Sequence, residues 1–231
     1  MNRGKLYGVG VGPGDPELLT RKAERIIKES AVLAVPDKGA GEKTALNIIG
    51  PLAHGKERLD CSTPMVRDQA VLDAAYDRAA DAICEKLDQG KDVAFITLGD
   101  PTVYSTYIYI HRRVVNRGYG AEIIPGVPSF CAVAARLGMA LCEKSERLLI
   151  VPASHKDMSD CMDLDANLVF MKAGKEIGAL KDTLADRGLL DRASMVANCG
   201  MEGELVCPKF ADMADGSGYF SVVLVKKGEQ A

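Results

Sequence analysis

Hydrophobic positions recur along this chain with two periods, which alternate through its first half. Residues 69–87 place apolar side chains at 71, 72, 75, 79, 83 and 87, a three-to-four spacing that predicts an amphipathic helix. Residues 93–98 form a short, nearly unbroken apolar run, typical of a strand buried on both faces. Similar patterns predict strands at 6–11, 31–35, 58–61 and 121–124, helices at 16–29 and 104–116, and a short helical or irregular stretch at 44–49. Such alternation is typical of a mostly parallel α/β unit.

The second half of the chain is richer in predicted strands. They fall at 148–152, 168–172, 194–199, 204–207 and 219–226, with helices at 129–137 and 176–187. The last of these strands alternates more than a fully buried strand would, which favours a mixed or antiparallel sheet. We therefore expect two α/β domains, an N-terminal one at 1–125 and a C-terminal one at 126–231, with the boundary near Pro125-Gly126.

Composition places the chain among ordinary globular proteins. It has 231 residues, of which 47% are hydrophobic and 26% charged, close to the usual averages, and the length fits one large domain or two small ones. Lys and Arg total 29 against 32 Asp and Glu, which gives a net charge of −3. A dedicated nucleic-acid binder would be basic, and anionic membranes do not attract an acidic chain. Neither partner is expected.

Nothing in the sequence predicts export, a membrane span or a metal centre. The apolar runs fall well short of the roughly 20 residues that cross a bilayer, and the first residues lack the apolar region of a secretion signal. The seven cysteines include no Cys-x-x-Cys pair and the three histidines no His-x-x-x-His pair. No disulfide framework or protein metal site is predicted, and we expect a cytoplasmic protein.

Three predicted strand-to-helix junctions carry the candidate chemistry. They are Gly10-Val11-Gly12-Pro13-Gly14-Asp15-Pro16, Leu98-Gly99-Asp100-Pro101 and Pro125-Gly126-Val127-Pro128-Ser129. Aspartate before proline favours a helix start, because the carboxylate caps N–H groups and proline has none to leave unpaired. Glycine permits sharp turns and close approach to a ligand. Capping would explain any one junction. Since ligands bind outside the carboxyl ends of parallel strands, however, three such loops are expected to line one crevice.

The first junction does not match the dinucleotide-binding fingerprint. Gly-x-Gly begins at Gly8 or Gly10, but the third position beyond its second glycine is Pro13 or Asp15. Pyrophosphate binding depends on a glycine there, and Asp15 would place a negative charge beside the phosphates. NAD and FAD are therefore discounted. The absence of Gly-x-x-x-x-Gly-Lys-Ser/Thr also removes the usual nucleotide triphosphatases.

The three junctions resemble the motifs of the tetrapyrrole (corrin/porphyrin) methylases, the class III S-adenosylmethionine-dependent methyltransferases. Residues 8–20 are similar to the first motif of that family, Gly99-Asp100-Pro101 to the second and residues 125–129 to the third, in the same order across nearly the whole chain. Within the family, the most similar subgroup methylates C(20) of precorrin-2 or cobalt-factor II in cobalamin biosynthesis. That similarity rests on Pro64-Met65, Arg67-Asp68, Tyr104-Ser105-Thr106 and Gly126-Val127-Pro128-Ser129-Phe130.

The resemblance implies two α/β domains of the tetrapyrrole methylase type, with the active site in the cleft between them, and a homodimer. It also implies S-adenosyl-L-methionine as cofactor and S-adenosyl-L-homocysteine as product. The implied cofactor contacts are Pro13, Gly99, Asp100, Val103, Pro128 and Ser129 from the three motifs, with Met171 and Ala197 from the second domain. Leu98 stands where the family often has glycine, which weakens the case for a backbone contact there.

The implied reaction transfers a methyl group from a sulfonium to a meso carbon of a reduced tetrapyrrole. Cofactor and substrate then carry the difficult chemistry, and the protein mainly aligns them. No catalytic residue is assigned for that reason. Such an acceptor bears many carboxylates, so Arg67, Tyr104, His111 and Arg112 are candidate substrate-binding residues. His111 and Arg112 belong to a basic cluster with Arg113 and Arg117, for which favourable interaction with a helix C-terminus is the alternative explanation.

Other functions stay open at this point. A related enzyme could methylate a different ring carbon, and a protein methyltransferase similar to diphthine synthase would use a side chain as acceptor. A non-catalytic module would bind the cofactor without turnover, whereas an oxidoreductase would be stabilised by a dinucleotide. The sequence does not distinguish a metal-free acceptor from a cobalt-containing one.

Overall fold

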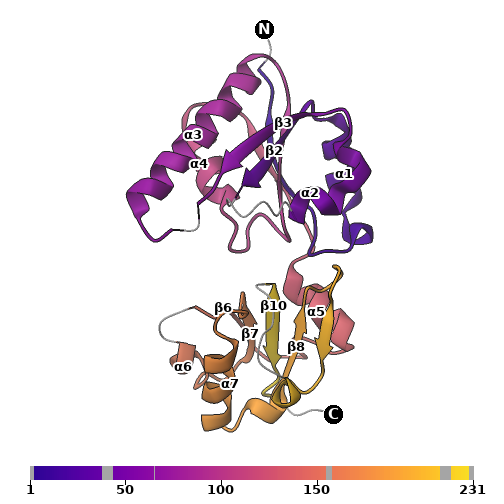
Figure 1. The fold of residues 1–231 in the computed structure, drawn as a ribbon, viewed down its shortest axis with the longest axis vertical. Helices are drawn as coiled ribbons and strands as arrows, with labels where there is room; N and C mark the ends of the chain where they lie inside the picture. Colours follow the sequence, from indigo (N-terminus) through magenta and orange to yellow (C-terminus); the bar gives the residue numbers. More distant parts are fainter. Residues whose placement is uncertain (1–2, 38–43, 65, 155–157, 214–219, 229–231) are drawn as a thin grey trace. The chain divides into compact units, whose positions relative to one another are not determined.

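A computed structural model describes residues 3–37, 44–64, 66–154, 158–213 and 220–228 (Figure 1). The chain divides into two compact units, Met1–Pro128 and Ser129–Ala231. This division falls three residues after the boundary placed at residue 125. The physical reason is that Gly126 lies against Gly10 and Gly99 of the first unit, so most of the third junction belongs with the other two.

The first unit is built on a five-stranded, fully parallel sheet. Its strands are β1 (Leu6–Gly10), β2 (Val32–Asp37), β3 (Glu57–Ser62), β4 (Val93–Thr97) and β5 (Ala121–Ile124), in the spatial order β3-β2-β4-β1-β5. The helices are η1 (Pro16–Leu18), α1 (Arg21–Glu29), α2 (Thr44–Ile49), η2 (Gly50–Ala53), α3 (Gln69–Asp88) and α4 (Tyr107–Asn116). Because β1 lies between β4 and β5, all three strands end side by side at what we call the carboxyl edge.

Helices cover both faces of this parallel sheet (Figure 1). On one face α3 and α4 pack against Leu6 and Phe95, and on the other α1 and α2 pack against Val9 and Ile96. Neighbouring residues of a strand point to opposite faces. Strands covered on both sides therefore need apolar residues throughout, which explains the apolar run in β4.

The helix predicted at 16–29 is interrupted. A single turn of 3-10 helix, η1, is separated from α1 by extended backbone at Leu19 and Thr20. The Thr20 hydroxyl accepts the backbone N–H of Ala23 at 3.1 Å and so caps α1, while Asp15 caps η1. Side chains that bond to nearby backbone compete with helix continuity, so two caps five residues apart produce two short helices.

The helix predicted from residue 104 begins later, at Tyr107. Tyr104 has a φ of 47°, in the left-handed region that a right-handed helix does not use. The Ser105 hydroxyl accepts the N–H of Tyr107 and lies 2.9 Å from the hydroxyl of Thr97. This pair of hydroxyls fastens the turn that carries Tyr104 to the end of β4.

The second unit contains a mixed sheet. Its strands are β6 (Leu148–Pro152), β7 (Asn167–Met171), β8 (Ala193–Ala197), β9 (Leu205–Cys207) and β10 (Ser221–Val225), in the order β6-β7-β10-β8-β9. Only the β6–β7 pair is parallel among these described strands. The helices are α5 (Ser129–Leu137), α6 (Met158–Cys161), α7 (Ile177–Asp186), η3 (Leu190–Arg192) and η4 (Phe210–Asp212). The predicted fold class, with a parallel and a mixed sheet, is confirmed.

The alternation at residues 219–226 favoured a mixed or antiparallel sheet, and that prediction is confirmed, since β10 is antiparallel to both neighbours. β10 is the central strand of the sheet, and each of its residues is buried. Two polar residues, Ser221 within the strand and Lys226 just after it, are buried as well, with 0% and 5% of their surface exposed. Their polarity therefore reports buried polar contacts and not a solvent-facing side.

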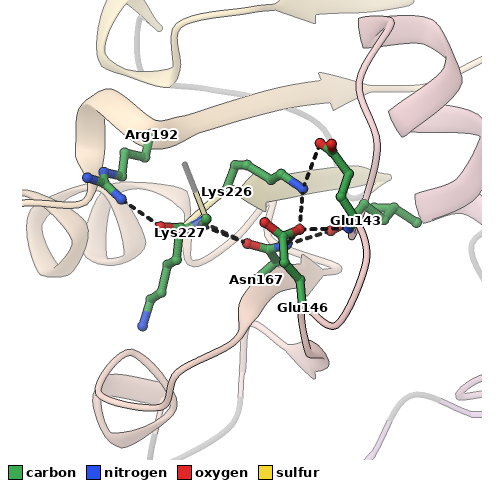
Figure 2. Close-up of polar contacts among 8 residues, drawn as sticks. Glu143, Glu146, Asn167, Arg192, Lys226 and Lys227 are labelled. Atoms are coloured by element: carbon green, nitrogen blue, oxygen red, sulfur yellow. Dashed lines mark hydrogen bonds and ion pairs between the residues drawn. The ribbon is translucent and has the colours of Figure 1, made fainter. Parts of the chain in front are cut away.

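Figure 2 shows the contacts that accommodate Lys226. Its ammonium lies 2.6 Å from the carboxylate of Glu146 and 3.5 Å from that of Glu143. The amide of Asn167 donates to Glu146 and its oxygen accepts the N–H of Lys227. Because β10 is antiparallel to β7, this network lies at the end of the sheet where β7 begins. It joins the chain before β6 to the chain after β10.

Candidate functional site

Hydrogen bonds join the three junction loops at the carboxyl edge, between backbone groups for the first two loops and through a side chain for the third. Gly99 donates its N–H to the carbonyl of Gly12 at 2.7 Å, and the N–H of Gly12 donates to the carbonyl of Gly99 at 3.3 Å. Their φ angles are 69° and 78°, a conformation that glycine adopts without strain. The third loop is attached through the N–H of Gly126, which donates to Asp100 at 3.0 Å. The structure thus brings the three sequence motifs together.

Two further glycines allow these loops to touch. A Cβ on Gly126 would lie 2.3 Å from the Gly99 carbonyl oxygen, and a Cβ on Gly10 would lie 2.6 Å from the same atom. Both distances are far inside van der Waals contact, so no side chain fits at either position without moving backbone. Gly10 and Gly126 therefore serve the packing of one loop on another, whereas the sequence had suggested turns or ligand approach.

Asp100 is the buried charge among these loops, with 8% of its surface exposed. One carboxylate oxygen accepts the backbone N–H of Thr102 at 2.8 Å and also the Thr102 hydroxyl. The other oxygen accepts the N–H of Gly126. The residue after Asp100, Pro101, begins a turn and not the expected helix. Asp100 therefore links the second loop to the third instead of capping a helix.

The other predicted cofactor residues of the first unit lie on the same three loops. Pro13 is buried in the first loop, and Val103 and Pro128 are half-buried in the second and third. The N–H of Val103 donates to the carbonyl of Asp100 at 3.3 Å. Ser129 is the first residue of α5 and belongs to the second unit.

Met171 is the last residue of β7 and Ala197 is the last residue of β8. Their side chains point to opposite faces of the second sheet. Met171 pairs with Val222 and Ala197 with Ser221, on either side of β10. Since adjacent residues of a strand point to opposite faces, the two side chains do so as well. Ala197 lies in the hydrophobic core that includes α7. Any contact from Ala197 to a cofactor would therefore come from its backbone.

Two residues with a left-handed backbone, which the sequence analysis did not single out, follow these strand ends directly. Lys172 and Asn198 have φ angles of 59° and 50°, and such non-glycine residues concentrate at functional sites because the conformation costs about 1–3 kcal/mol. Asn198 donates its N–H to the carbonyl of Phe220 at 3.1 Å. Asparagine adopts the left-handed region more readily than most residues, so the residue type was a weak indication of this conformation at Asn198. It was no indication at Lys172.

Among the predicted substrate-binding residues, Tyr104 follows β4, which ends at the carboxyl edge, and Arg67 follows β3 of the same sheet. Tyr104 exposes 47% of its surface despite its left-handed backbone. Arg67 is exposed in the segment between β3 and α3, and no hydrogen bond or ion pair of its side chain is found in the described part of the chain. Met65, part of the same sequence motif, lies outside the described residues.

The structure divides the basic cluster on α4. Arg113 contacts Asp73 at 2.6 Å and Asp77 at 2.8 Å, and Arg117 contacts Asp81 at 2.9 Å. All three carboxylates belong to α3. Arg113 and Arg117 therefore hold two helices together. Arg112 is exposed beside them and makes no ion pair within the described ranges.

His111 is hydrogen-bonded to a tyrosine of its own helix. Its Nδ1 lies 2.8 Å from the hydroxyl of Tyr107, a residue with no exposed surface. Burial, and secondly the charge of Arg112, lower the pKa of His111, while burial raises the pKa of Tyr107. His111 is therefore hydrogen-bonded to a buried tyrosine, and burial disfavours the cationic form of its ring.

Two kinds of feature are absent from the part of the chain that the structure describes. No three side chains from His, Cys, Asp and Glu are grouped in these ranges so as to hold a metal ion. No helix among the described residues combines the length and apolar character needed to cross a membrane.

Known proteins resemble this chain over nearly its full length. The family model for Tetrapyrrole (Corrin/Porphyrin) Methylases matches residues 5–213. Cobalt-precorrin-2 C(20)-methyltransferase of Salmonella typhimurium is 34% identical over 230 residues, 97% of each chain. Precorrin-2 C(20)-methyltransferase of a Sinorhizobium species is 30% identical over 234 residues, 96% of this chain and 95% of that one.

A solved structure supports the same assignment at the level of the fold. Uroporphyrin-III C-methyltransferase from Thermus thermophilus, complexed with S-adenosylhomocysteine, superimposes with a TM-score of 0.70 over 96% of this chain and 98% of that one, at 22% identity. The family model, the full-length relatives and the three joined loops agree. The resemblance expected from the sequence is confirmed: this chain belongs to the tetrapyrrole (corrin/porphyrin) methylases.

Proposed function

We propose that this chain transfers a methyl group from S-adenosylmethionine to C(20) of precorrin-2 or of its cobalt-containing form. The observation that carries the proposal is the match, along nearly the whole chain, to two relatives that are both named for C(20). The joined loops at the carboxyl edge support a cofactor site there, because ligands of parallel sheets bind outside the ends of the strands.

The loops fit a positively charged cofactor. Residues 10–16, 98–103 and 125–129 contain no Lys, Arg or His and include two aspartates, so nothing in them repels a cation. S-adenosylmethionine, when bound, would supply an electrophilic methyl group on a cationic sulfur. Pro13, Gly99, Val103 and Pro128 would hold it at this edge, with Asp100 keeping the second and third loops together, and Ser129, Met171 and Ala197 are proposed as further contacts.

The chain's own contribution to the reaction is orientation. Aligning a bound acceptor carbon with a methyl donor can account for about 7–11 kcal/mol of the barrier. Loops joined by backbone hydrogen bonds suit this task, because they lose little freedom on binding. No side chain at the edge needs to act as nucleophile.

Four side chains are proposed to bind the polycarboxylate acceptor. Arg67 and Arg112 are exposed cations that can pair with carboxylates. His111 is half-buried beside Arg112 and offers a ring nitrogen for hydrogen bonding. Tyr104 presents a half-exposed aromatic ring, suited to lie against a flat macrocycle.

Incubation with labelled S-adenosylmethionine and each acceptor, metal-free or cobalt-containing, tests the proposal directly. NMR of the product is expected to show the new methyl group at C(20), and the faster acceptor identifies the physiological form. A methyl group on another ring carbon would assign the chain to a different reaction of the family. Transfer to a protein side chain would support the diphthine-synthase alternative, and cofactor binding without any transfer a non-catalytic module.

Two adjacent arginines provide a matched test of substrate binding. Arg112→Ala is expected to raise the KM for the acceptor about tenfold with unchanged thermal stability, since it removes a charge-assisted contact. Arg113→Ala should instead lower the melting temperature and leave KM nearly constant, because Arg113 pairs with α3. Arg67→Ala should behave like Arg112→Ala. An unchanged KM in both the Arg67 and Arg112 variants would remove these residues from the site.

The family resemblance also supports a homodimer in the cytoplasm, with neither nucleic acid nor membrane as partner. Sedimentation equilibrium of the purified chain should give about twice its mass of 24.7 kDa. A monomer mass at micromolar concentration would contradict the dimer.

A further inference from the structure

The third loop has few hydrogen bonds to the rest of its unit. In the described structure, loop 125–128 is attached by the Gly126 N–H to Asp100 at 3.0 Å and by the Thr20 hydroxyl to the Pro125 carbonyl at 3.4 Å. The second distance is long for a hydrogen bond between these atoms. The carboxylate of Asp100 is therefore the main polar attachment of this loop.

The remaining acceptor capacity of Asp100 is small. A carboxylate has about four lone-pair positions, and the backbone and hydroxyl of Thr102 with the N–H of Gly126 use three of them. The group is also nearly fully buried. These facts fit a carboxylate whose partners are within the chain better than one directed at a ligand.

We propose that Asp100 is a positioning residue, which sets the distance between the second and third loops through Gly126, and is not the counter-charge of the cofactor's sulfonium. This inference rests on the proposed cofactor site at the carboxyl edge. Electrostatic attraction would make Asp100 favour the cationic S-adenosylmethionine over the uncharged sulfur of S-adenosylhomocysteine. Positioning would affect both ligands alike, because both need the same loop arrangement.

Asp100→Asn separates the two roles. The amide oxygen can still accept from Thr102, but the amide nitrogen would face the Gly126 N–H, donor against donor, so the third loop loses its attachment. Isothermal titration of the full chain is expected to show at least tenfold weaker binding of both ligands, by the same factor. A loss for S-adenosylmethionine ten times greater than that for S-adenosylhomocysteine would overturn the proposal.

Asp15→Asn is the matched control, because Asp15 also precedes a proline in a junction loop. Its side chain accepts the N–H of Glu17 at 2.9 Å, and asparagine caps as well as aspartate does. Both affinities should stay at the wild-type values. In ¹⁵N–¹H spectra, the Gly126 amide resonance should move strongly upfield in the Asp100 variant and remain in place in the Asp15 variant. An unmoved Gly126 resonance in Asp100→Asn would contradict the attachment.

Asp100→Glu keeps the test decisive should the asparagine variant fold poorly. Glutamate preserves the charge but lengthens the side chain, so positioning predicts weaker binding of both ligands and a counter-charge role predicts unchanged binding. If the wild-type chain binds neither ligand, the proposed cofactor site fails. Binding by wild type with unaffected Asp100 variants refutes the positioning role alone.

Discussion

Among the described residues, each unit buries one charged side chain, and the two are satisfied in different ways. Asp100 in the first unit and Lys226 in the second expose 8% and 5% of their surface. Asp100 accepts hydrogen bonds from neutral donors, two backbone N–H groups and a hydroxyl. Lys226 lies against the carboxylates of Glu146 and Glu143 (Figure 2).

The two arrangements join different parts of the chain. Asp100 uses its neutral donors to join the second loop to the third at the carboxyl edge of the first sheet. Around Lys226, burial acts to lower its pKa, but the hydrogen bond and the charges of Glu146 and Glu143 outweigh it and raise the pKa. That network joins the segment before β6 to the segment after β10. It lies at the end of the second sheet opposite to Met171 and Ala197.

The largest effect is expected from Gly126→Ala, which tests whether contact between the loops matters beyond the Asp100 bond. The new Cβ would lie 2.3 Å from the Gly99 carbonyl oxygen, and backbone would have to move. We expect destabilisation by about 1–3 kcal/mol and loss of methyl transfer by more than a hundredfold, measured by thermal unfolding and initial rates.

Gly120→Ala is the control for that substitution. A Cβ there would meet the Lys5 side chain at 3.7 Å, an ordinary contact, so stability and rate should remain within error of wild type. Equal behaviour of the two variants would show that close packing of the loops is unimportant.

A smaller effect is expected from Lys226→Met. Removing one member of a buried ion pair typically costs 3–5 kcal/mol. Because the Glu146 side chain is 25% exposed and water can solvate it, we expect about 2 kcal/mol for loss of Lys226. Urea unfolding measures the change, with Lys175→Met, an exposed position, as the control that should stay within about 0.5 kcal/mol of wild type.

The double variant Glu146→Gln/Lys226→Met sharpens this result. It removes the carboxylate left without its ammonium, so part of the lost stability should return, and the four proteins form a double-mutant cycle. Strict additivity would mean that Lys226 contributes through packing alone and that the contrast with Asp100 is not one of charge.

The smallest effect concerns an exposed cluster of charges. Hydrogen bonds from Lys22 and Lys5 hold the pKa of Glu122 at about 2. A lowered folded-state pKa gives stability that is present above the unfolded value near 4.5 and is lost as pH falls towards 2. Glu122→Gln should therefore be slightly less stable than wild type at pH 7 and equal to it at pH 2, in urea titrations. High salt should also reduce the difference at pH 7; a difference unchanged by pH would exclude the ion pairs as its source.

Local sequence patterns predicted most helices and strands, because the residues that form such an element are neighbours in the chain. The helix Ser129–Leu137 has the predicted bounds, and apolar runs located the buried strands of both sheets. The meeting of the three junctions was also predictable, since parallel strands end at one edge. The prediction failed at 16–29 and at Tyr104, where side-chain bonds from Thr20 and Ser105 interrupt helices that periodicity alone would continue.

The basic cluster illustrates what local pattern cannot decide. Consecutive helical residues point about 100° apart, so of Arg112 and Arg113 one faces α3 and the other does not. The packing of α4 on α3 places Arg113 against α3. Its acidic partner Asp73 lies 40 residues away along the chain. From the sequence alone, both belonged to one basic cluster, from which Arg112 was named as a candidate for substrate binding.

The sequence by itself determined the order of the elements, the two kinds of sheet and membership of the methylase family, because these follow from periodicity and from motifs within short segments. Only the tertiary structure decided what each polar residue does. Asp100 meets Gly126, 26 residues away, and Lys226 meets Glu146, 80 residues away. A hydrogen bond depends on distances of about 3 Å between atoms, and for residues so far apart in the chain, packing alone sets those distances.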